Sequence, residues 1–147
     1  MGKRPTLTDI TTSGTETPLD MSKQIVGGGG NVGGAAVNTY YPLNGGNNGS
    51  TTINLNSLNC PIAGFISKLT FSSDLPPGAG ETVTATLYKN GVATALTCQI
   101  AGAVDTFATD GINTIMFTAT DLLTIQVLNS ILSNVTRTNW GALLIFP

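Results

Sequence analysis

Apolar and polar residues alternate with a period of two through most of the chain after residue 50. The clearest run is residues 81–89, where Val83, Ala85 and Leu87 alternate with polar residues and Tyr. A period of two is typical of a β-strand with one buried face. The Asn-Gly pair at 90–91 follows, and this pair favours the two left-handed positions of a tight hairpin turn. The pattern therefore predicts a β-hairpin.

Further short strands are predicted on both sides of this hairpin, for about eight in all. Their residue ranges are 37–43, 51–55, 65–71, 81–89, 92–100, 112–118, 122–127 and 140–146. The residues expected to face the core are Phe65, Leu69, Phe71, Val92, Leu96, Cys98, Ile100, Ile115, Phe117, Leu123, Ile125 and Val127. Turn signals recur at roughly the 8–12-residue spacing of all-β sandwiches and barrels. The fold class predicted by the pattern is therefore all-β.

The last predicted strand is apolar on both faces. One face would carry Trp140, Ala142, Leu144 and Phe146, and the other Gly141, Leu143 and Ile145. A strand that is buried on both sides needs a second covering layer. In a domain this small, another copy of the subunit is one source of that layer, and we interpret Trp140, Leu143 and Ile145 as an oligomer interface. The alternative is that the glycine-rich N-terminal segment folds over this strand.

The first 50 residues differ in character from the rest of the chain. They are rich in Thr and Gly, and the stretch from Gln24 to Ser67 contains no charged residue. Glycine at this density gives the backbone too much freedom to fold independently. We therefore predict an extended arm over residues 1–50 and a folded domain over residues 51–147. An uncharged arm of this kind is either flexible or laid against another surface. The arm residues expected to contact such a surface are Pro18, Leu19, Ile25, Val26, Tyr40 and Tyr41.

Charge is scarce, which excludes some functions. Lys, Arg, Asp and Glu make up 10% of the 147 residues, against about 25% in an ordinary soluble domain. The net charge is −2, and six scattered cations cannot neutralise a nucleic-acid backbone. No apolar run follows Lys3 and Arg4, and the longest one, residues 142–146, is too short to span a bilayer. We expect no nucleic-acid partner, no secretory signal and no membrane segment.

The residues that usually carry catalysis are missing. The chain has no histidine, so Ser-His-Asp and Cys-His arrangements and His-bound metals are excluded. Cys60 and Cys98 allow one disulfide at most, and their apolar neighbours favour buried small side chains. Residues 28–33 match G-x-G-x-x-G, but no helical pattern follows and no acid occurs between Asp20 and Asp74. We predict a protein without enzymatic activity, cofactor or metal.

Two weaker possibilities remain at this point. Asp105 and Asp110 frame a loop whose carboxylate and carbonyl oxygens would suit calcium, although the spacing matches no EF-hand and turn-forming Asp is the simpler interpretation. The exposed strand faces carry Thr and Asn with Tyr88 among them. Such a face would suit sugars or a protein, although Thr is also favoured on any pleated surface.

Several segments resemble known virion proteins. Residues 69–98, which include Leu75-Pro-Pro-Gly-Ala-Gly80, and residues 120–127 resemble jelly-roll modules in phage virion proteins. The final residues Trp140-Gly-Ala-Leu-Leu-Ile-Phe-Pro147 are similar to the last strand of the tumour necrosis factor and complement globular-head superfamily. That superfamily usually has Gly before the Asp of the penultimate hairpin, whereas this chain has Thr120. The arm resembles, more loosely, the amino-terminal segments of small phage head proteins.

The resemblance covers residues 60–147 and implies a jelly-roll β-sandwich that forms homotrimers with its terminal strand near the threefold axis. It carries no functional residues. We expect a structural protein on the capsid surface of a virion, present in the host cytoplasm during assembly. Its partners would be other copies of itself and the major capsid protein, which the arm would contact. The alternative is the tip of a phage fibre or spike, which would bind a glycan or host receptor.

Overall fold

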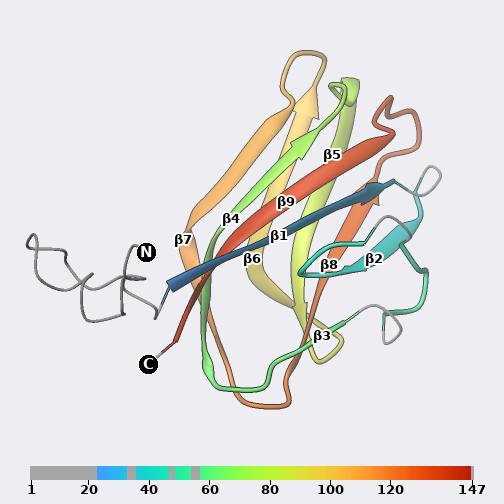
Figure 1. Ribbon diagram of the computed structural model, residues 1–147. Helices are drawn as coiled ribbons and strands as arrows, with labels where there is room; N and C mark the ends of the chain where they lie inside the picture. Colours follow the sequence, from blue (N-terminus) through green and yellow to red (C-terminus); the bar gives the residue numbers. More distant parts are fainter. Residues whose placement is uncertain (1–22, 33–35, 47–48, 54–56, 147) are drawn as a thin grey trace, which may run out of the picture.

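Nine β-strands form two antiparallel sheets in the computed structural model, which describes residues 23–32, 36–46, 49–53 and 57–146 (Figure 1). The strands are β1 (Lys23–Asn31), β2 (Asn38–Pro42), β3 (Leu58–Asn59), β4 (Gly64–Ser73), β5 (Gly78–Lys89), β6 (Val92–Gly102), β7 (Phe107–Phe117), β8 (Leu122–Asn129) and β9 (Arg137–Ile145). The all-β prediction is confirmed, with one strand more than expected.

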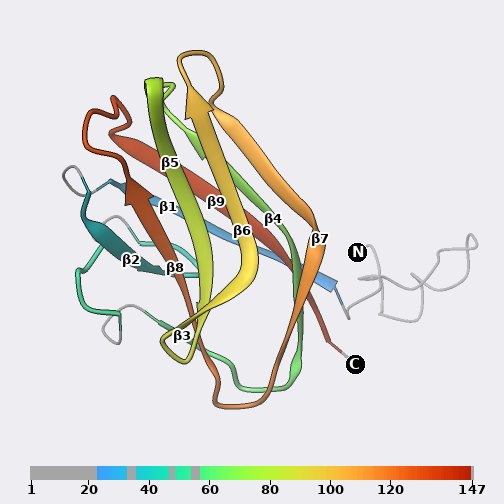
Figure 2. The ribbon, with the colours of Figure 1, turned by 180° about the vertical axis from the view of Figure 1, so that it is seen from behind.

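The strand order is that of a jelly roll. One sheet, here called sheet A, has the order β1-β9-β4-β7. The other, sheet B, has the order β2-β8-β5-β6, with the short β3 also paired to β8. Apart from the β5–β6 hairpin, every connection between consecutive strands from β4 onward crosses from one sheet to the other, as Figure 2 shows from behind. These interleaved crossings form the double-sheet jelly roll predicted from the resemblance.

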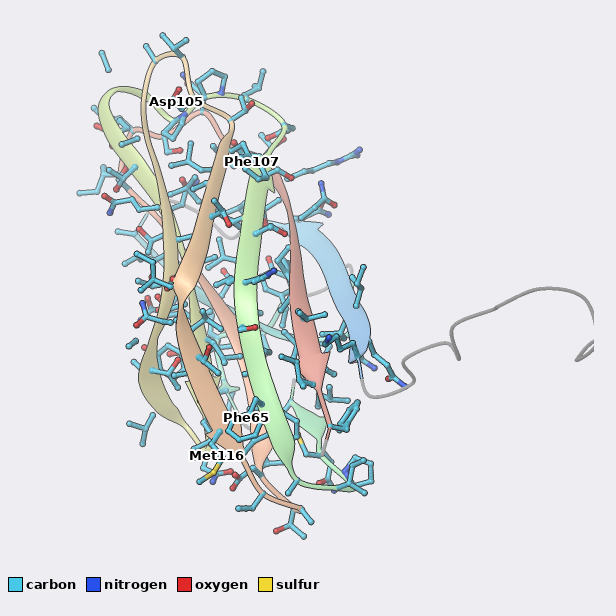
Figure 3. All side chains as sticks on the ribbon, turned by 90° about the vertical axis from the view of Figure 1, so that its left-hand side faces the viewer. Phe65, Asp105, Phe107 and Met116 are labelled. Atoms are coloured by element: carbon cyan, nitrogen blue, oxygen red, sulfur yellow. The ribbon has the colours of Figure 1, made fainter. Side chains whose placement is uncertain are left out.

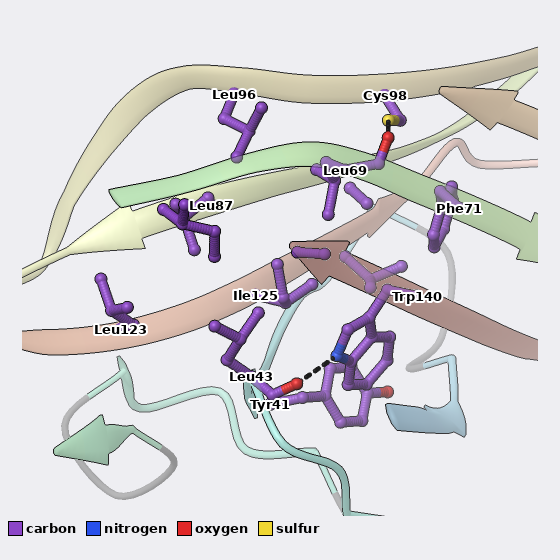
Figure 4. Close-up of a cluster of buried hydrophobic side chains, with 14 of the residues drawn as sticks. Tyr41, Leu43, Leu69, Phe71, Leu87, Leu96, Cys98, Leu123, Ile125 and Trp140 are labelled. Carbon is purple, nitrogen blue, oxygen red and sulfur yellow. Dashed lines mark hydrogen bonds between the residues drawn. The ribbon is translucent and has the colours of Figure 1, made fainter. Parts of the chain in front are cut away.

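The core lies between the two sheets and is built by the alternating residues (Figure 4). Val83, Ala85 and Leu87 of β5 are fully buried, and so are Leu123, Ile125 and Val127 of β8. Burial of each large apolar side chain contributes about 1.5–3 kcal/mol. The period-two pattern therefore identified the buried face of these strands correctly.

A β-bulge in β4 turns one of the residues predicted to face the core toward the outside. The pairing of β4 with both neighbours shifts register after Ser67, and Lys68 has a φ of 53°. The extra residue moves Phe65 to the outward side, while Leu69 and Phe71 remain in the core. The prediction that Phe65 faces inward is therefore wrong, because a bulge inverts the alternation on one side of it.

Strand β6 contains a second exception to the predicted inward set. Val92 is largely exposed, whereas Leu96, Cys98 and Ile100 are buried as predicted. The β5–β6 pairing shifts register between Thr86 and Tyr88, close to the hairpin turn. The irregular pairing separates Val92 from the alternation that holds farther along the strand.

The sandwich begins well inside the segment predicted to be an arm. Strand β1 pairs antiparallel with β9 along all nine residues, from Lys23 opposite Ile145 to Asn31 opposite Arg137. Strand β2 pairs with β8, as expected for the short strand near residues 37–43. Residues 51–53 form bends and a turn rather than a strand, and residues 54–56 lie outside the described ranges. The composition of β1 concealed it, because its backbone is held by pairing rather than by its own propensity.

Two glycines of β1 allow close packing against the core aromatics. A Cβ at Gly30 would lie 2.2 Å from Cε1 of Tyr41, and one at Gly28 would lie 2.2 Å from the Cα of Gly45. Tyr41 also donates its hydroxyl hydrogen to the carbonyl oxygen of Asn31. The glycine run of β1 therefore has a packing role, because its missing side chains make room for the aromatic ring.

Turns at the opposite end from the β6–β7 loop use left-handed backbone. Asn90 and Gly91 have φ values of 52° and 82°, which confirms the predicted hairpin. Thr120 has a φ of 78°, an unusual value for a β-branched residue. This is the position at which the resembling superfamily usually has glycine, so the turn has the geometry expected there while carrying a less favourable residue.

Candidate interaction surface

The outward face of sheet B is polar, and several of its side chains are hydrogen-bonded to one another. The hydroxyl oxygens of Thr86 and Thr97 lie 3.0 Å apart across β5 and β6. Gln99 donates from Nε2 to the Thr84 hydroxyl at 3.1 Å. Cross-strand threonine pairs of this kind stabilise sheets whose faces are hydrated. This face can remain in water without cost.

The outward face of sheet A is apolar at the end where β1 begins and β9 ends. One row across the sheet runs from Lys23 through Ile145 and Phe65 to Met116, and the next begins with Ile25 and Leu143. Ile25 is 88% exposed, Met116 60% and Phe65 41%, whereas Leu143 and Ile145 are half-buried. Figure 3 shows Phe65 and Met116 close together on neighbouring strands of this face. We call Ile25, Phe65, Met116, Leu143 and Ile145 the apolar face.

The predicted interface residues separate into two groups. Leu143 and Ile145 lie on the apolar face, as the two-sided pattern of the last strand required. Trp140 does not lie there: it is 4% exposed, and its indole Nε1 donates to the carbonyl oxygen of Leu43 at 3.0 Å. Its ring also packs on Tyr41 with centroids 5.0 Å apart. The assignment of Trp140 to an oligomer interface is therefore wrong, because even-numbered residues of β9 face the other sheet.

The predicted arm residues are also divided among different surroundings. Ile25 lies on the apolar face, and Val26 packs against the core from the inner side of β1. Tyr40 lies on the outward side of sheet B, where its ring meets the edge of Tyr88 at 5.7 Å. Tyr41 is fully buried, so it is a core residue and not a partner contact. Pro18 and Leu19 lie outside the described residues.

Sequence reasoning missed Phe65 and Met116 as members of this surface. Phe65 was assigned to the core because the bulge at Lys68 is invisible in the alternation. Met116 was left without a role, although it alternates with the inward residues Ile115 and Phe117. A large apolar residue at an outward position of a confirmed strand is the signal that would have found it.

The carboxylates of the described residues serve mainly as loop anchors. Asp110 accepts hydrogen bonds from the backbone amides of Thr97, Ile112 and Asn113 and from the Asn113 side chain, at 2.8–3.1 Å. Asp74 accepts from the amides of Leu75, Thr136 and Arg137.

Two further acids close other loops. Glu81 accepts from the Ser130 hydroxyl and the Leu132 amide. Asp121 accepts from the Thr118 amide and from Asn90, and its Oδ2 lies 3.9 Å from Nζ of Lys89. A carboxylate whose oxygens already accept hydrogen bonds from the backbone has a structural role. Such an arrangement is typical of a loop anchor and not of an acid-base pair.

The loop framed by Asp105 and Asp110, which the sequence offered as a calcium site, is also anchored by hydrogen bonds to a carboxylate. Asp110 is buried and fully occupied by protein donors, while Asp105 lies at the tip of the β6–β7 loop, at the top of Figure 3. Within the described ranges no group of three metal-ligating side chains comes together. A hollow of about 620 Å³ near the start of β9 is polar, and the carboxylate in its lining, Asp74, accepts hydrogen bonds from the β9 end. Its lining consists of Gly29, Gly30, Asn31, Gly46, Asp74, Arg137, Thr138 and Asn139.

Both cysteines are free and buried, as the small-side-chain interpretation predicted. Burial raises the pKa of each thiol to about 11. The charge of Asp121 adds to the effect at Cys60, whereas at Cys98 a hydrogen bond from the Asp110 backbone opposes it and the Asp110 charge adds to it. The Cys98 thiol donates to the carbonyl oxygen of Leu69, 3.2 Å away, which links the two sheets. Since the thiolate is the reactive form, burial and a raised pKa both disfavour nucleophilic reaction of either cysteine near neutral pH.

Loop anchoring by carboxylates predicts acid sensitivity. Burial raises the pKa of Asp110, but the hydrogen bonds from Asn113, Thr97 and Ile112 outweigh it and hold the value at about 2. A pKa below that of the unfolded chain stabilises the fold above pH 4, and this stabilisation is lost as the pH falls toward 2. We expect the Asp110 contribution, about 2 kcal/mol, to disappear over that range. The chain has no histidine, so we expect no side-chain step between pH 5 and 8.

Denaturant unfolding between pH 2 and pH 8 measures this effect. Asp110→Asn keeps the side-chain size but loses the carboxylate, so the variant should be less stable at pH 7 and should lose less stability on acidification. An unchanged acid slope in the variant would show that Asp110 contributes nothing to it.

Fold and surface together define a class: an all-β jelly-roll sandwich with one hydrated sheet face and one apolar sheet face. Comparison with known proteins adds no narrower identity, because no family model matches the chain and no curated protein matches it significantly. In the part of the chain that the structure describes, no helix is long and apolar enough to cross a membrane.

Proposed function

We propose that this chain is a non-enzymatic virion structural protein, a capsid decoration or cement protein that forms homotrimers through its jelly roll. The observation that carries the proposal is the apolar face of sheet A, which leaves Ile25, Phe65 and Met116 in water in a single copy. An exposed apolar patch on a folded β-sheet is typical of a protein contact surface. The last strand supplies Leu143 and Ile145 to it, in keeping with the terminal strand of the resembling trimers.

Attachment to the major capsid protein is assigned to the N-terminal residues. Residues 1–22 precede β1, which begins at the apolar end of sheet A, and they include the predicted contacts Pro18 and Leu19. Occupation of Asp74, Glu81, Asp110 and Asp121 by loop donors supports a structural role over a catalytic one.

Self-association is tested by placing charge on the apolar face. The double variant Phe65→Lys/Met116→Lys should no longer form trimers at micromolar concentration, because desolvating two lysines opposes apolar burial. The control, Thr97→Lys/Gln99→Lys, adds the same charge to the hydrated face of sheet B and should keep the wild-type mass. Equal masses for the apolar-face variant and the wild type would contradict the proposed interface.

The virion role is tested by electron microscopy of particles with and without the chain. We expect many copies in groups of three on the capsid, lower particle stability when the chain is absent, and no attachment of a variant that lacks residues 1–22. A few copies at a fibre tip, with an intact capsid but blocked adsorption when they are lost, would instead favour the receptor-binding alternative.

A further inference from the structure

Strand β1 forms an open edge of the sandwich. It is the outermost strand of sheet A, paired with β9 on one side only. On the opposite flank the two sheets are tied together, since Asp110 of β7 accepts from the Thr97 amide of β6 at 3.1 Å. At the β2 edge of sheet B, Tyr40 exchanges backbone hydrogen bonds with Ser50. Among the described strands, β1 is therefore the long edge with the least cover.

The edge lacks the features that usually prevent strand pairing. Natural edges are protected by proline, bulges, inward charges or very short length. Strand β1 is nine residues long, contains no proline, and pairs with β9 without a register shift. Its single charged residue is Lys23, at the first position. A long, regular and nearly uncharged edge is a site for an added strand.

The sequence of β1 fits a second copy of itself. Its first half carries the side chains of Gln24, Ile25 and Val26, and its second half is the run 27–30, which consists of glycine. Antiparallel pairing about a twofold axis through Gly27 matches position i with position 54 − i. Each of the three side chains is then opposite a glycine of the other strand, and Lys23 is opposite Asn31. When one half of a strand carries large side chains and the other half consists of glycine, two antiparallel copies can pair without steric conflict.

We infer that β1 pairs with β1 of a second copy, antiparallel and in full register, so that sheet A continues across two subunits. A twofold contact of this kind uses the same surface on both copies. It uses the open backbone edge of β1, whereas the proposed threefold contact uses the outward side chains of the apolar face, to which β1 contributes Ile25. The inference extends the proposed function, because a threefold and a twofold contact on one subunit link trimers into larger arrays, as a cementing layer requires.

Position 31 offers a test that leaves the apolar face unchanged. Asn31 is exposed at the end of β1, and in the inferred register it lies opposite Lys23 of the second copy at both ends of the ladder. Asn31→Lys creates two like-charge pairs, and we expect it to weaken the twofold contact by about tenfold or more. The matched variant Asn31→Glu creates two opposite-charge pairs and should strengthen the contact to a similar degree.

Masses measured by light scattering over a concentration series separate the two contacts. The wild type should form assemblies larger than three copies, Asn31→Lys only trimers at the same concentration, and Phe65→Lys/Met116→Lys only dimers. The variant with all three substitutions should be a monomer of 15.1 kDa. Hydrogen exchange adds a direct readout, since the β1 amides that point away from β9 should gain protection as the concentration rises.

Each failure is distinguishable. Identical assembly of Asn31→Lys, Asn31→Glu and the wild type, with no concentration-dependent protection of β1, overturns the edge contact and leaves the trimer proposal intact. Dimers in the wild type that Asn31→Lys converts to monomers support the edge contact and overturn the trimer. A wild type that remains monomeric at concentrations up to about 100 micromolar overturns both the edge contact and the trimer.

Discussion

Replacing Trp140 with alanine is expected to lower the free energy of unfolding by about 4 kcal/mol. The indole is 4% exposed, packs on Tyr41 and donates to the Leu43 carbonyl oxygen, so truncation removes apolar burial and leaves a cavity and an unpaired acceptor. The residue joins β9 of sheet A to the segment after β2 of sheet B. We therefore expect loss of cohesion between the sheets, measured by denaturant unfolding of the full chain.

A second substitution separates packing from hydrogen bonding at this position. Trp140→Phe keeps an aromatic ring beside Tyr41 but removes the N–H donor to Leu43, and it should cost about 1–3 kcal/mol. If Trp140→Ala instead dissociated assemblies without lowering the stability of the single copy, the original interface interpretation of this residue would be restored.

Gly30→Ala is expected to destabilise the sandwich by about 3 kcal/mol, although it adds a single methyl group. The new Cβ would lie 2.2 Å from Cε1 of Tyr41 and 2.9 Å from its Cζ. The ring cannot easily yield, because it is fully buried, its hydroxyl is bound to Asn31, and it packs against the ring of Trp140. We expect either displacement of Tyr41 or separation of the end of β1 from β9.

Gly111→Ala is the matched control for this experiment. Gly111 also lies in a strand of sheet A, but a Cβ there would meet nothing within 4 Å. Its substitution should change stability by less than about 0.5 kcal/mol. Similar effects of the two substitutions in thermal or denaturant unfolding would show that the cost comes from strand propensity and not from contact with Tyr41.

Local patterns predicted the strands whose partners are near in sequence. The β5–β6 hairpin followed from alternation and from Asn90-Gly91, because both the buried face and the turn geometry are encoded within about twenty residues. The inward residues of β8 followed from alternation alone, although its partners β5 and β2 are distant in sequence. Two of the five residues of the apolar face, Leu143 and Ile145, also followed from a strand with two apolar sides.

The errors arose where distant parts of the chain decide the outcome. Strand β1 was hidden because its glycines are required by Tyr41, eleven residues beyond Gly30, and its pairing partner β9 begins more than one hundred residues away. Trp140 was misplaced because alternation gives two faces of a strand without saying which one meets the second sheet. Phe65 was misplaced by one bulge residue, Lys68. None of these three features has a local signal.

The commitment of carboxylates to loop backbone bears on how copies would find one another. Asp74, Glu81, Asp110 and Asp121 are half of the eight acids in the chain, and their charge is met by neighbouring amides and hydroxyls within the subunit. Hydrogen bonds from neutral donors leave these charges in place, but the chain has only six basic and eight acidic side chains and a net charge of −2. Little organised electric field therefore guides an approaching subunit over long range. Association should therefore proceed at an unsteered rate, on the order of 10⁵–10⁶ M⁻¹ s⁻¹, and should change little with ionic strength. Assembly of such a protein would be set by its concentration rather than by the salt around it.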